Sequence, residues 1–263
     1  MEKRRKNYLL FLTYKGSLFH GWQKQKSLPS VQQTLEEAIS CISPGKISLT
    51  GCGRTDAGTH ALSYTANIYL GKDFPLEKLQ AAVNAHLPCS IRVIRVKQVP
   101  LFFHSRYLAA EKTYRYLIAD RPSPFLEKTA WVITEPLDLK EMKQAASLLT
   151  GKHNFTSFQN TGSQRRDPVR EIKRITFRQT RFTLDPSVKM IVVEITATGF
   201  LYKMARNIVG LLVAVGRHRL PEKQVAQILQ AQDRKLAPPP APAWGLYLKR
   251  VIYRKKTSRR NQG

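Results

Sequence analysis

The first hundred residues alternate between short apolar runs, which predict strands, and two amphipathic stretches, which predict helices. Ser30 followed by Gln33 matches a capping box and starts the first helix, which ends near Ile42. Pro75 stands at the first helical position of the second helix, which ends near His86. The strands are predicted at Tyr8–Tyr14, Ile47–Gly51, Leu62–Leu70 and Ile91–Val99. This β-α-β-β-α-β order is typical of a ferredoxin-like, or split βαβ, unit.

The rest of the chain repeats that order of elements, although its sequence shows no internal repeat. Asp138 with Glu141 caps one predicted helix, and an apolar stretch over Leu201–Val215 predicts another. A short additional helix is predicted to begin at Pro221. The strands are predicted at Thr113–Ile118, Ile172–Leu184, Lys189–Thr196 and Gly245–Tyr253. The expected fold is α/β (α+β), with two ferredoxin-like halves that each carry a mainly antiparallel sheet and helices on one face.

We expect the boundary between the halves near residues 105–111, with an N-terminal half over 1–106 and a C-terminal half over 107–253. Residues 254–263 form a basic tail for which no structure is predicted. Two internal segments also look irregular: 161–174, with five basic and two acidic residues, and the proline-rich Ala237–Ala243. Each basic segment is either a solvated loop or an RNA contact.

The chain carries 44 Lys and Arg residues against 18 Asp and Glu residues, so its formal net charge is +26. A positive excess of this size repels itself unless a polyanion lies against it. Nucleic acid is therefore the first expected partner, and an anionic membrane surface or a small acidic substrate is less favoured. Hydrophobic residues make up 42% of the chain, which is enough for a packed core and excludes a disordered basic protein.

The sequence indicates neither an oxidising compartment nor a membrane. Its three cysteines form no CxxC pair. The basic N-terminus is followed by a short apolar run that meets Lys15, which is not the form of a signal peptide. The longest uncharged apolar stretch, Ile208–Gly216, is far shorter than a membrane span. We expect a cytoplasmic protein that has no membrane partner.

The segment Gly51–Ala61, GCGRTDAGTHA, is the strongest candidate for chemistry. Its glycine spacing resembles a phosphate-binding P-loop, but Thr59 and His60 stand where Lys and Ser or Thr are required. The dinucleotide-binding fingerprint fails as well, because Asp56 occupies its third glycine position. What remains is a carboxylate in a glycine-rich loop, whose main chain a bulky substrate can approach closely.

Arg54 lies two residues before Asp56 and is expected to favour the charged form of this carboxylate. Such an Asp can act as a nucleophile or a base, and the alternative is an ordinary turn with a charged partner. His60 and His104 are further acid–base candidates, although a single His is more often a structural hydrogen-bonding residue. The sequence lacks the motifs of zinc deaminases, two-metal nucleases and RRM domains.

The segment GRTDAGTHA resembles the active-site motif of the tRNA pseudouridine synthase A family. Other segments between residues 14 and 253 resemble further motifs of this family in the same order. Thr59 and Ala205 stand where the family usually has valine, and neither side chain is expected to carry chemistry. The matching segments are Phe19–Gln25 with Val31 and Gln32, Asn84–Pro88, Phe103–Tyr107, Lys112–Tyr116, Gly151–Phe155, Gly199–Asn207 and Ala241–Leu248.

The resemblance implies a pseudouridine-synthase fold and an isomerase that converts uridine to pseudouridine at tRNA positions 38, 39 and 40, in the anticodon arm. It also implies a reaction without metal or cofactor, and a homodimer that binds tRNA. The target nucleotide has to leave its stack before any side chain can reach its sugar. The alternative is a basic RNA-binding protein that has this scaffold without the activity.

By its place in the motif, Asp56 is the catalytic aspartate. It attacks C1′, adds to C6 or removes a sugar proton, and all three routes require an ionised carboxylate. Arg206 corresponds to the family's arginine that pairs with the aspartate, and Tyr114 to the tyrosine that stacks on the target uracil. The remaining substrate-binding candidates are Leu246 and Leu248, either of which closes the other side of the pocket, and Arg54. Arg54 either contacts the backbone of the extruded nucleotide or holds the flipped state.

Overall fold

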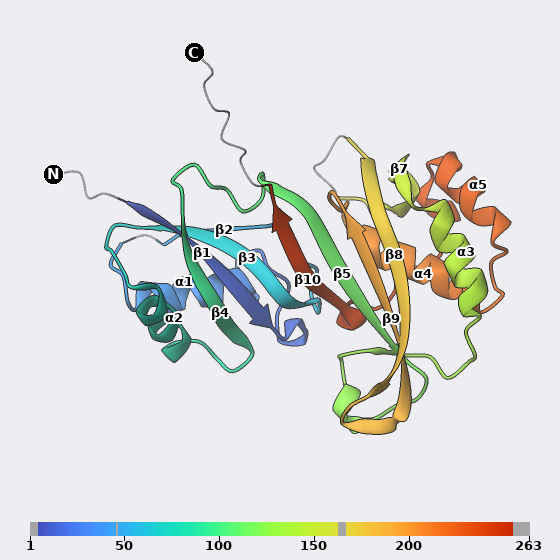
Figure 1. The fold of residues 1–263 in the computed structure, drawn as a ribbon, viewed down its shortest axis with the longest axis horizontal. Helices are drawn as coiled ribbons and strands as arrows, with labels where there is room; N and C mark the ends of the chain where they lie inside the picture. The colour runs from blue at the N-terminus through green and yellow to red at the C-terminus, as the bar shows by residue number, and fades with distance from the viewer. Residues whose placement is uncertain (1–4, 46, 163–166, 255–263) are drawn as a thin grey trace, which may run out of the picture.

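The computed structural model of the protein describes residues 5–45, 47–162 and 167–254. These residues form five α-helices and ten strands, and all the strands join into one sheet (Figure 1). The helices are α1 (Val31–Ser40), α2 (Leu76–Ala85), α3 (Leu139–Leu148), α4 (Met204–Gly216) and α5 (Lys223–Ala231). The strands are β1 (Lys6–Tyr14), β2 (Leu49–Gly51), β3 (His60–Leu70), β4 (Ile91–Val99), β5 (Ala109–Ala119), β6 (Trp131–Val132), β7 (Gly151–Asn154), β8 (Val169–Phe182), β9 (Asp185–Ala197) and β10 (Leu246–Tyr253).

The order of strands in space confirms the predicted fold of two ferredoxin-like halves. The N-terminal strands lie in the order β4-β1-β3-β2 and the C-terminal strands in the order β10-β5-β9-β8, which is the same arrangement twice. Pairing among these strands within each half is antiparallel, the short β6 pairs in parallel with β5, and β10 joins the halves by running parallel to β3. In Figure 1, α1 and α2 lie behind the N-terminal strands and α4 lies behind β8 and β9.

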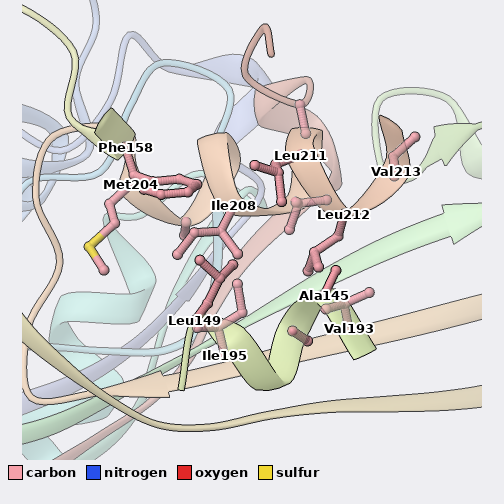
Figure 2. Close-up of a cluster of buried hydrophobic side chains, with 14 of the residues drawn as sticks. Ala145, Leu149, Phe158, Val193, Ile195, Met204, Ile208, Leu211, Leu212 and Val213 are labelled. Carbon is pink, nitrogen blue, oxygen red and sulfur yellow. The ribbon is translucent and has the colours of Figure 1, made fainter. Parts of the chain in front are cut away.

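Two hydrophobic cores lie on either side of the β3–β10 junction. The C-terminal core packs α4 against α3 and β9, and Figure 2 shows its side chains interlocking. The last strand contributes to both cores, since Leu246 packs in the C-terminal core and Leu248 in the N-terminal one. On this basis we propose residues 1–106 and 107–253 as the two structural units. No helix in the described ranges is long and apolar enough to cross a membrane.

Two of the predicted helices, α1 and α3, begin with a side-chain cap. The Ser30 hydroxyl accepts a hydrogen bond from the Gln33 N–H at 3.3 Å, as a capping box requires. The Gln33 side chain does not complete the box, because it donates to Glu37 instead. The Asp138 carboxylate accepts from the second and third N–H groups of α3. α2 departs slightly from prediction: Pro75 precedes the helix as its N-cap residue rather than occupying its first turn.

The helix predicted from Leu201 begins three residues later, at Met204. Lys203 has a left-handed backbone with φ of +59°, a conformation that cannot continue a right-handed helix. Residues 201–203 therefore form a turn, which is closed by a hydrogen bond from the Met204 N–H to the Leu201 carbonyl at 3.1 Å. The turn sets the direction in which α4, and with it Arg206, enters the core.

The prediction of an irregular segment over 161–174 is wrong from residue 169 onward, where β8 begins. The start of β8 pairs with β7 on one side and with β9 on the other, through Ile172 opposite both Gly151 and Ala197. Exposed basic side chains interrupt the apolar alternation of this strand, so its pattern in the sequence is weak. Residues 163–166, and the basic tail after Arg254, lie outside the described residues.

Candidate active site

Asp56 lies in the loop between β2 and β3, at the junction of the two halves. The loop closes in a turn, in which the Thr59 N–H donates to the Asp56 carbonyl at 3.1 Å. Gly58, inside this turn, has φ of +81°, a conformation that favours glycine over every residue with a Cβ. The glycine-rich sequence thus serves to turn the main chain sharply just after the carboxylate.

The segment after β1 holds this loop from the other side. The Trp22 N–H donates to the Thr55 carbonyl at 3.3 Å, and the Tyr14 hydroxyl lies 3.0 Å from the Thr55 hydroxyl. A Cβ at Gly21 would come within 2.5 Å of the Thr55 carbonyl oxygen, so only glycine allows this approach. The residues on both sides of Asp56 are therefore packed, which limits where its carboxylate can point.

Asp56 forms an ion pair with Arg206, which lies in the first turn of α4. The Asp56 Oδ2 atom lies 2.8 Å from the Arg206 terminal nitrogen. The two side chains are only 18% and 13% exposed, respectively. The Arg206 Nε donates separately to the Ala241 carbonyl at 2.7 Å. Because one guanidinium is held at two points, the carboxylate faces a cation whose position is fixed.

Tyr114, on β5, brings an aromatic ring to the same site. The ring is half-buried, and its edge-to-face contact with Phe200 has a centroid distance of 4.8 Å. Burial raises the pKa of the Tyr114 hydroxyl far above its ordinary value, and the neighbouring Cys52 and Asp56 raise it further. The hydroxyl therefore stays neutral near pH 7. The Tyr114 side chain packs against both hydrophobic cores, which places it at the junction of the two halves.

The other three predicted site residues lie in different environments. Leu248 stands opposite Tyr114 in the β10–β5 ladder and is 1% exposed. Leu246, two residues earlier, stands opposite Tyr116 and is 5% exposed. Arg54 is exposed, and among the described residues the ion pair of Asp56 is made by Arg206 rather than by Arg54. The structure thus gathers Asp56, Arg206 and Tyr114, with Leu248 in register beside the tyrosine.

Comparison with known proteins identifies the family of this chain. The family model of the tRNA pseudouridine synthases matches residues 11–108 and 145–254. The tRNA pseudouridine synthase A of Thermoanaerobacter sp. (strain X514) is 39% identical over 250 residues, 94% of this chain and 100% of that protein. That of Methylacidiphilum infernorum (isolate V4) is 41% identical over 249 residues, 94% of this chain and 95% of that protein. The chain belongs to the tRNA pseudouridine synthase family.

Two side chains of this family member support the Asp56 loop without having been predicted. The Lys112 ammonium donates to the Cys52 carbonyl, and the Tyr64 hydroxyl donates to the Gly53 carbonyl, both at 2.6 Å. Lys112 lies two residues before Tyr114 on the same face of β5. This spacing could have predicted from the sequence that Lys112 lies near the site. The Ala241 carbonyl that holds Arg206 had no such signal, because every residue carries a carbonyl.

His60 proves to be a structural histidine, as its isolation in the sequence suggested. Its Nδ1 accepts a hydrogen bond from the Gly16 N–H at 3.1 Å, so that nitrogen carries no proton. Its Nε2 donates to the Lys128 carbonyl at 2.9 Å. The ring is 2% exposed and stacks on Tyr247, with ring centroids 4.6 Å apart. The two partners require the neutral ring, which anchors the end of the Asp56 loop.

This arrangement predicts a loss of folding stability in mild acid. Burial lowers the pKa of His60 below its usual 6.5, and hydrogen bonds to the Lys128 and Trp244 carbonyls oppose this only partly. The unfolded chain then binds the proton more tightly, so stability is fully present above about pH 6.5 and falls below it, by at most ~1.4 kcal/mol per pH unit. His60→Gln keeps one donor and one acceptor but does not titrate.

Urea unfolding at several values between about pH 7.5 and 5.5 measures this dependence. We expect the variant to lose less stability across the range than the unchanged protein. His86→Gln, at an exposed position, is the matched control and should leave the pH dependence as it is. If the free energy of unfolding falls equally with pH in His60→Gln and in the unchanged protein, His60 does not cause the loss of stability.

Proposed function

We propose that this protein is a tRNA pseudouridine synthase that isomerises uridine at positions 38, 39 and 40 in the anticodon arm of tRNA. The observation that carries the proposal is the Asp56–Arg206 ion pair, at the junction of the two halves against which Tyr114 also packs. In the reaction, the bond from uracil N1 to ribose C1′ breaks and the base turns. A bond from C5 to C1′ then forms, N1 gains a proton and the proton on C5 is released to water.

Asp56 supplies the ionised carboxylate that this reaction needs. Attack on C1′, addition to C6 and removal of a sugar proton all begin from the charged oxygen, and we leave these three routes open. Arg206 orients the carboxylate through its 2.8 Å contact and holds a positive charge next to it. Acid–base or nucleophilic work by an oriented side chain of this kind requires neither a metal nor a cofactor.

Tyr114 offers the surface on which the target uracil stacks. Extruding a nucleotide from a helix costs a few kcal/mol, and stacking one base on an aromatic ring returns roughly 1–3 kcal/mol. Contacts between basic side chains and RNA phosphates provide the rest, which agrees with the net charge of +26. Leu248 is proposed to close the pocket with Leu246, and Arg54 to contact the backbone of the extruded nucleotide.

Two wider features belong to this proposal. A homodimer in which one tRNA contacts both subunits rests on the resemblance to the family, and a cytoplasmic location rests on the proposed substrate. The competing hypothesis is an RNA-binding protein without turnover. A binder needs neither a charged aspartate nor a fixed arginine partner, so the Asp56–Arg206 pair favours the enzyme.

Tritium release separates these hypotheses. The protein is incubated with tRNA that carries tritium at uracil C5, in the presence of EDTA, and the label that appears in water is counted. We expect release by the unchanged protein and the same release when EDTA is omitted. RNA binding without release would support the binder. Cleaved RNA and activity lost in EDTA would instead indicate a metal-dependent nuclease, for which the described residues contain no cluster of three metal-binding side chains.

A further inference from the structure

A groove of about 680 Å³ lies beside the proposed active site, where the segment between β5 and α3 meets the start of β10. In Figure 1 these two parts of the chain meet below the start of β10. Trp244 lines the groove with 42% of its surface exposed, and the half-buried Trp131 lines it as well. Pro122, Pro124 and Lys128 are also among the lining residues. The groove thus presents flat, apolar surfaces next to a cation.

Two hydrogen bonds join the segment that lines this groove to the strands beside the Asp56 loop. The Lys128 carbonyl accepts the hydrogen bond from His60, the first residue after the loop. Lys128 makes this contact with φ of +51°, a left-handed conformation that costs energy in a residue other than glycine. The Thr129 carbonyl accepts from the Tyr247 hydroxyl at 2.7 Å. The segment that lines the groove is therefore fastened to the strands that carry the site.

The groove is also close to the catalytic carboxylate. A Cβ placed on Gly58 would lie 3.4 Å from the Ala243 Cβ, and Trp244 follows Ala243 directly. Gly58 is two residues from Asp56, and consecutive Cα atoms are ~3.8 Å apart, so their Cα atoms are at most ~7.6 Å apart. Trp244 therefore follows a residue that packs against the Asp56 loop, which places the groove within reach of a nucleotide that neighbours the one at Asp56.

The chemistry of the lining favours an unpaired nucleoside. Extrusion of the target uridine leaves the base opposite it without a pairing partner and the adjacent bases without one stacking partner. Indole rings stack on any base, and a lysine attracts the attached phosphate. A volume of about 680 Å³ falls within the usual range of small-molecule sites. An acidic residue, Glu127, also borders the groove and partly offsets the charge of Lys128. We therefore attribute the affinity of the groove for a nucleoside to stacking rather than to charge alone.

We propose that this groove binds an unpaired nucleoside of the RNA substrate next to the flipped uridine, with its base stacked on Trp244. The inference rests on the proposed function, because it takes tRNA as the substrate. It assigns a second base-binding site to the chain, outside the Asp56–Arg206–Tyr114 cluster.

Tryptophan fluorescence tests the proposal directly, since the chain contains only three tryptophans. Trp22 is 3% exposed and stacks on Tyr64, with ring centroids 4.1 Å apart, so it is shielded from RNA. A change in fluorescence on adding an unmodified tRNA transcript then reports on Trp131 and Trp244. We expect quenching in the unchanged protein and the loss of most of it in Trp244→Phe.

Kinetics on the same transcript give the second measurement. Trp244→Ala should raise KM by about 5- to 150-fold, the effect of losing one stacked base, with kcat changed less than about threefold. Trp244→Phe should recover most of this loss, because a phenyl ring also stacks. Tyr69→Ala is the matched control, since Tyr69 is also 42% exposed but lies near the far end of β3. It should leave KM unchanged.

The outcomes of these experiments separate the groove proposal from the proposed function. If Trp244→Ala is active on tRNA and its KM is unchanged, the groove does not bind a nucleoside, but the proposed function stands. If the protein without substitutions binds tRNA and its tryptophan fluorescence is quenched, but no pseudouridine forms, the result contradicts the proposed function and not the groove. Loss of self-association in Trp244→Ala, with KM unaffected, assigns the groove to a second copy of the chain. Should Trp244→Ala fail to fold, Trp244→Phe and the quenching decide.

Discussion

Asp56→Asn is expected to lower the rate of pseudouridine formation by about 10⁴-fold, the upper end of what one acid–base group contributes. The amide has the shape of the carboxylate and can still accept a hydrogen bond from Arg206, so the loop should keep its conformation. Only the negative charge is lost, and each of the three routes open to Asp56 needs that charge. tRNA affinity should stay within a few-fold of the original, because phosphate contacts dominate it.

Single-turnover tritium release, together with a filter-binding measurement of tRNA affinity, tests this expectation. Asp73→Asn is the matched control, since Asp73 pairs with Lys6 and the Tyr8 hydroxyl at the other end of the N-terminal sheet. That variant should keep full turnover. Full turnover by Asp56→Asn would contradict the proposed chemistry outright. Equal loss of turnover in both variants would point to a general effect of charge or stability.

Arg206→Met should lower turnover by roughly 10²- to 10³-fold, the usual effect of removing one oriented hydrogen-bond donor from an active site. The carboxylate would be left four-fifths buried without its cation, and would also lose the group that fixes its direction. Arg206→Lys should recover only part of the rate. A single ammonium cannot reproduce the planar fork that contacts both Asp56 and the Ala241 carbonyl.

The double variant shows whether the pair acts as a unit. If Arg206 works through Asp56, Asp56→Asn with Arg206→Met should be no slower than Asp56→Asn alone. Arg115→Met is the matched control, because Arg115 also lies 2.8 Å from a carboxylate, that of Glu194. Lys249 keeps Glu194 paired when Arg115 is removed, so turnover should change less than a few-fold. Additive losses from Asp56 and Arg206 would show that they act independently.

Local sequence patterns predicted the elements well where one physical signal dominated. Alternating apolar residues revealed the central strands, and the Ser30 and Asp138 side chains marked helix starts that the structure confirms. The hydrophobic pattern failed to predict element boundaries where the residue types present did not reflect the local backbone conformation. Basic side chains hid the start of β8, and the apolar run before α4 concealed the left-handed backbone of Lys203.

The residues of the candidate site were likewise predictable from the sequence only in part. An isolated carboxylate among glycines pointed to Asp56 from the residues alone, because such a loop is costly unless it serves a function. Pairing with Arg206 was expected only through the resemblance to the family, since 150 residues separate the two positions. Arg54 looked like the natural partner by proximity in the sequence, yet its side chain is exposed and the ion pair forms elsewhere.

The amino-acid sequence by itself determined the order of the longer strands and helices, the excess of positive charge and Asp56 as the candidate carboxylate, because these depend on neighbouring residues. The folded chain decided which distant groups meet. Insertion of β10 between β3 and β5 brings Leu248 opposite Tyr114. The same closure places the Ala241 carbonyl against Arg206 and Trp244 near the Asp56 loop. Such contacts depend on how whole strands pair in space, which no short stretch of sequence encodes.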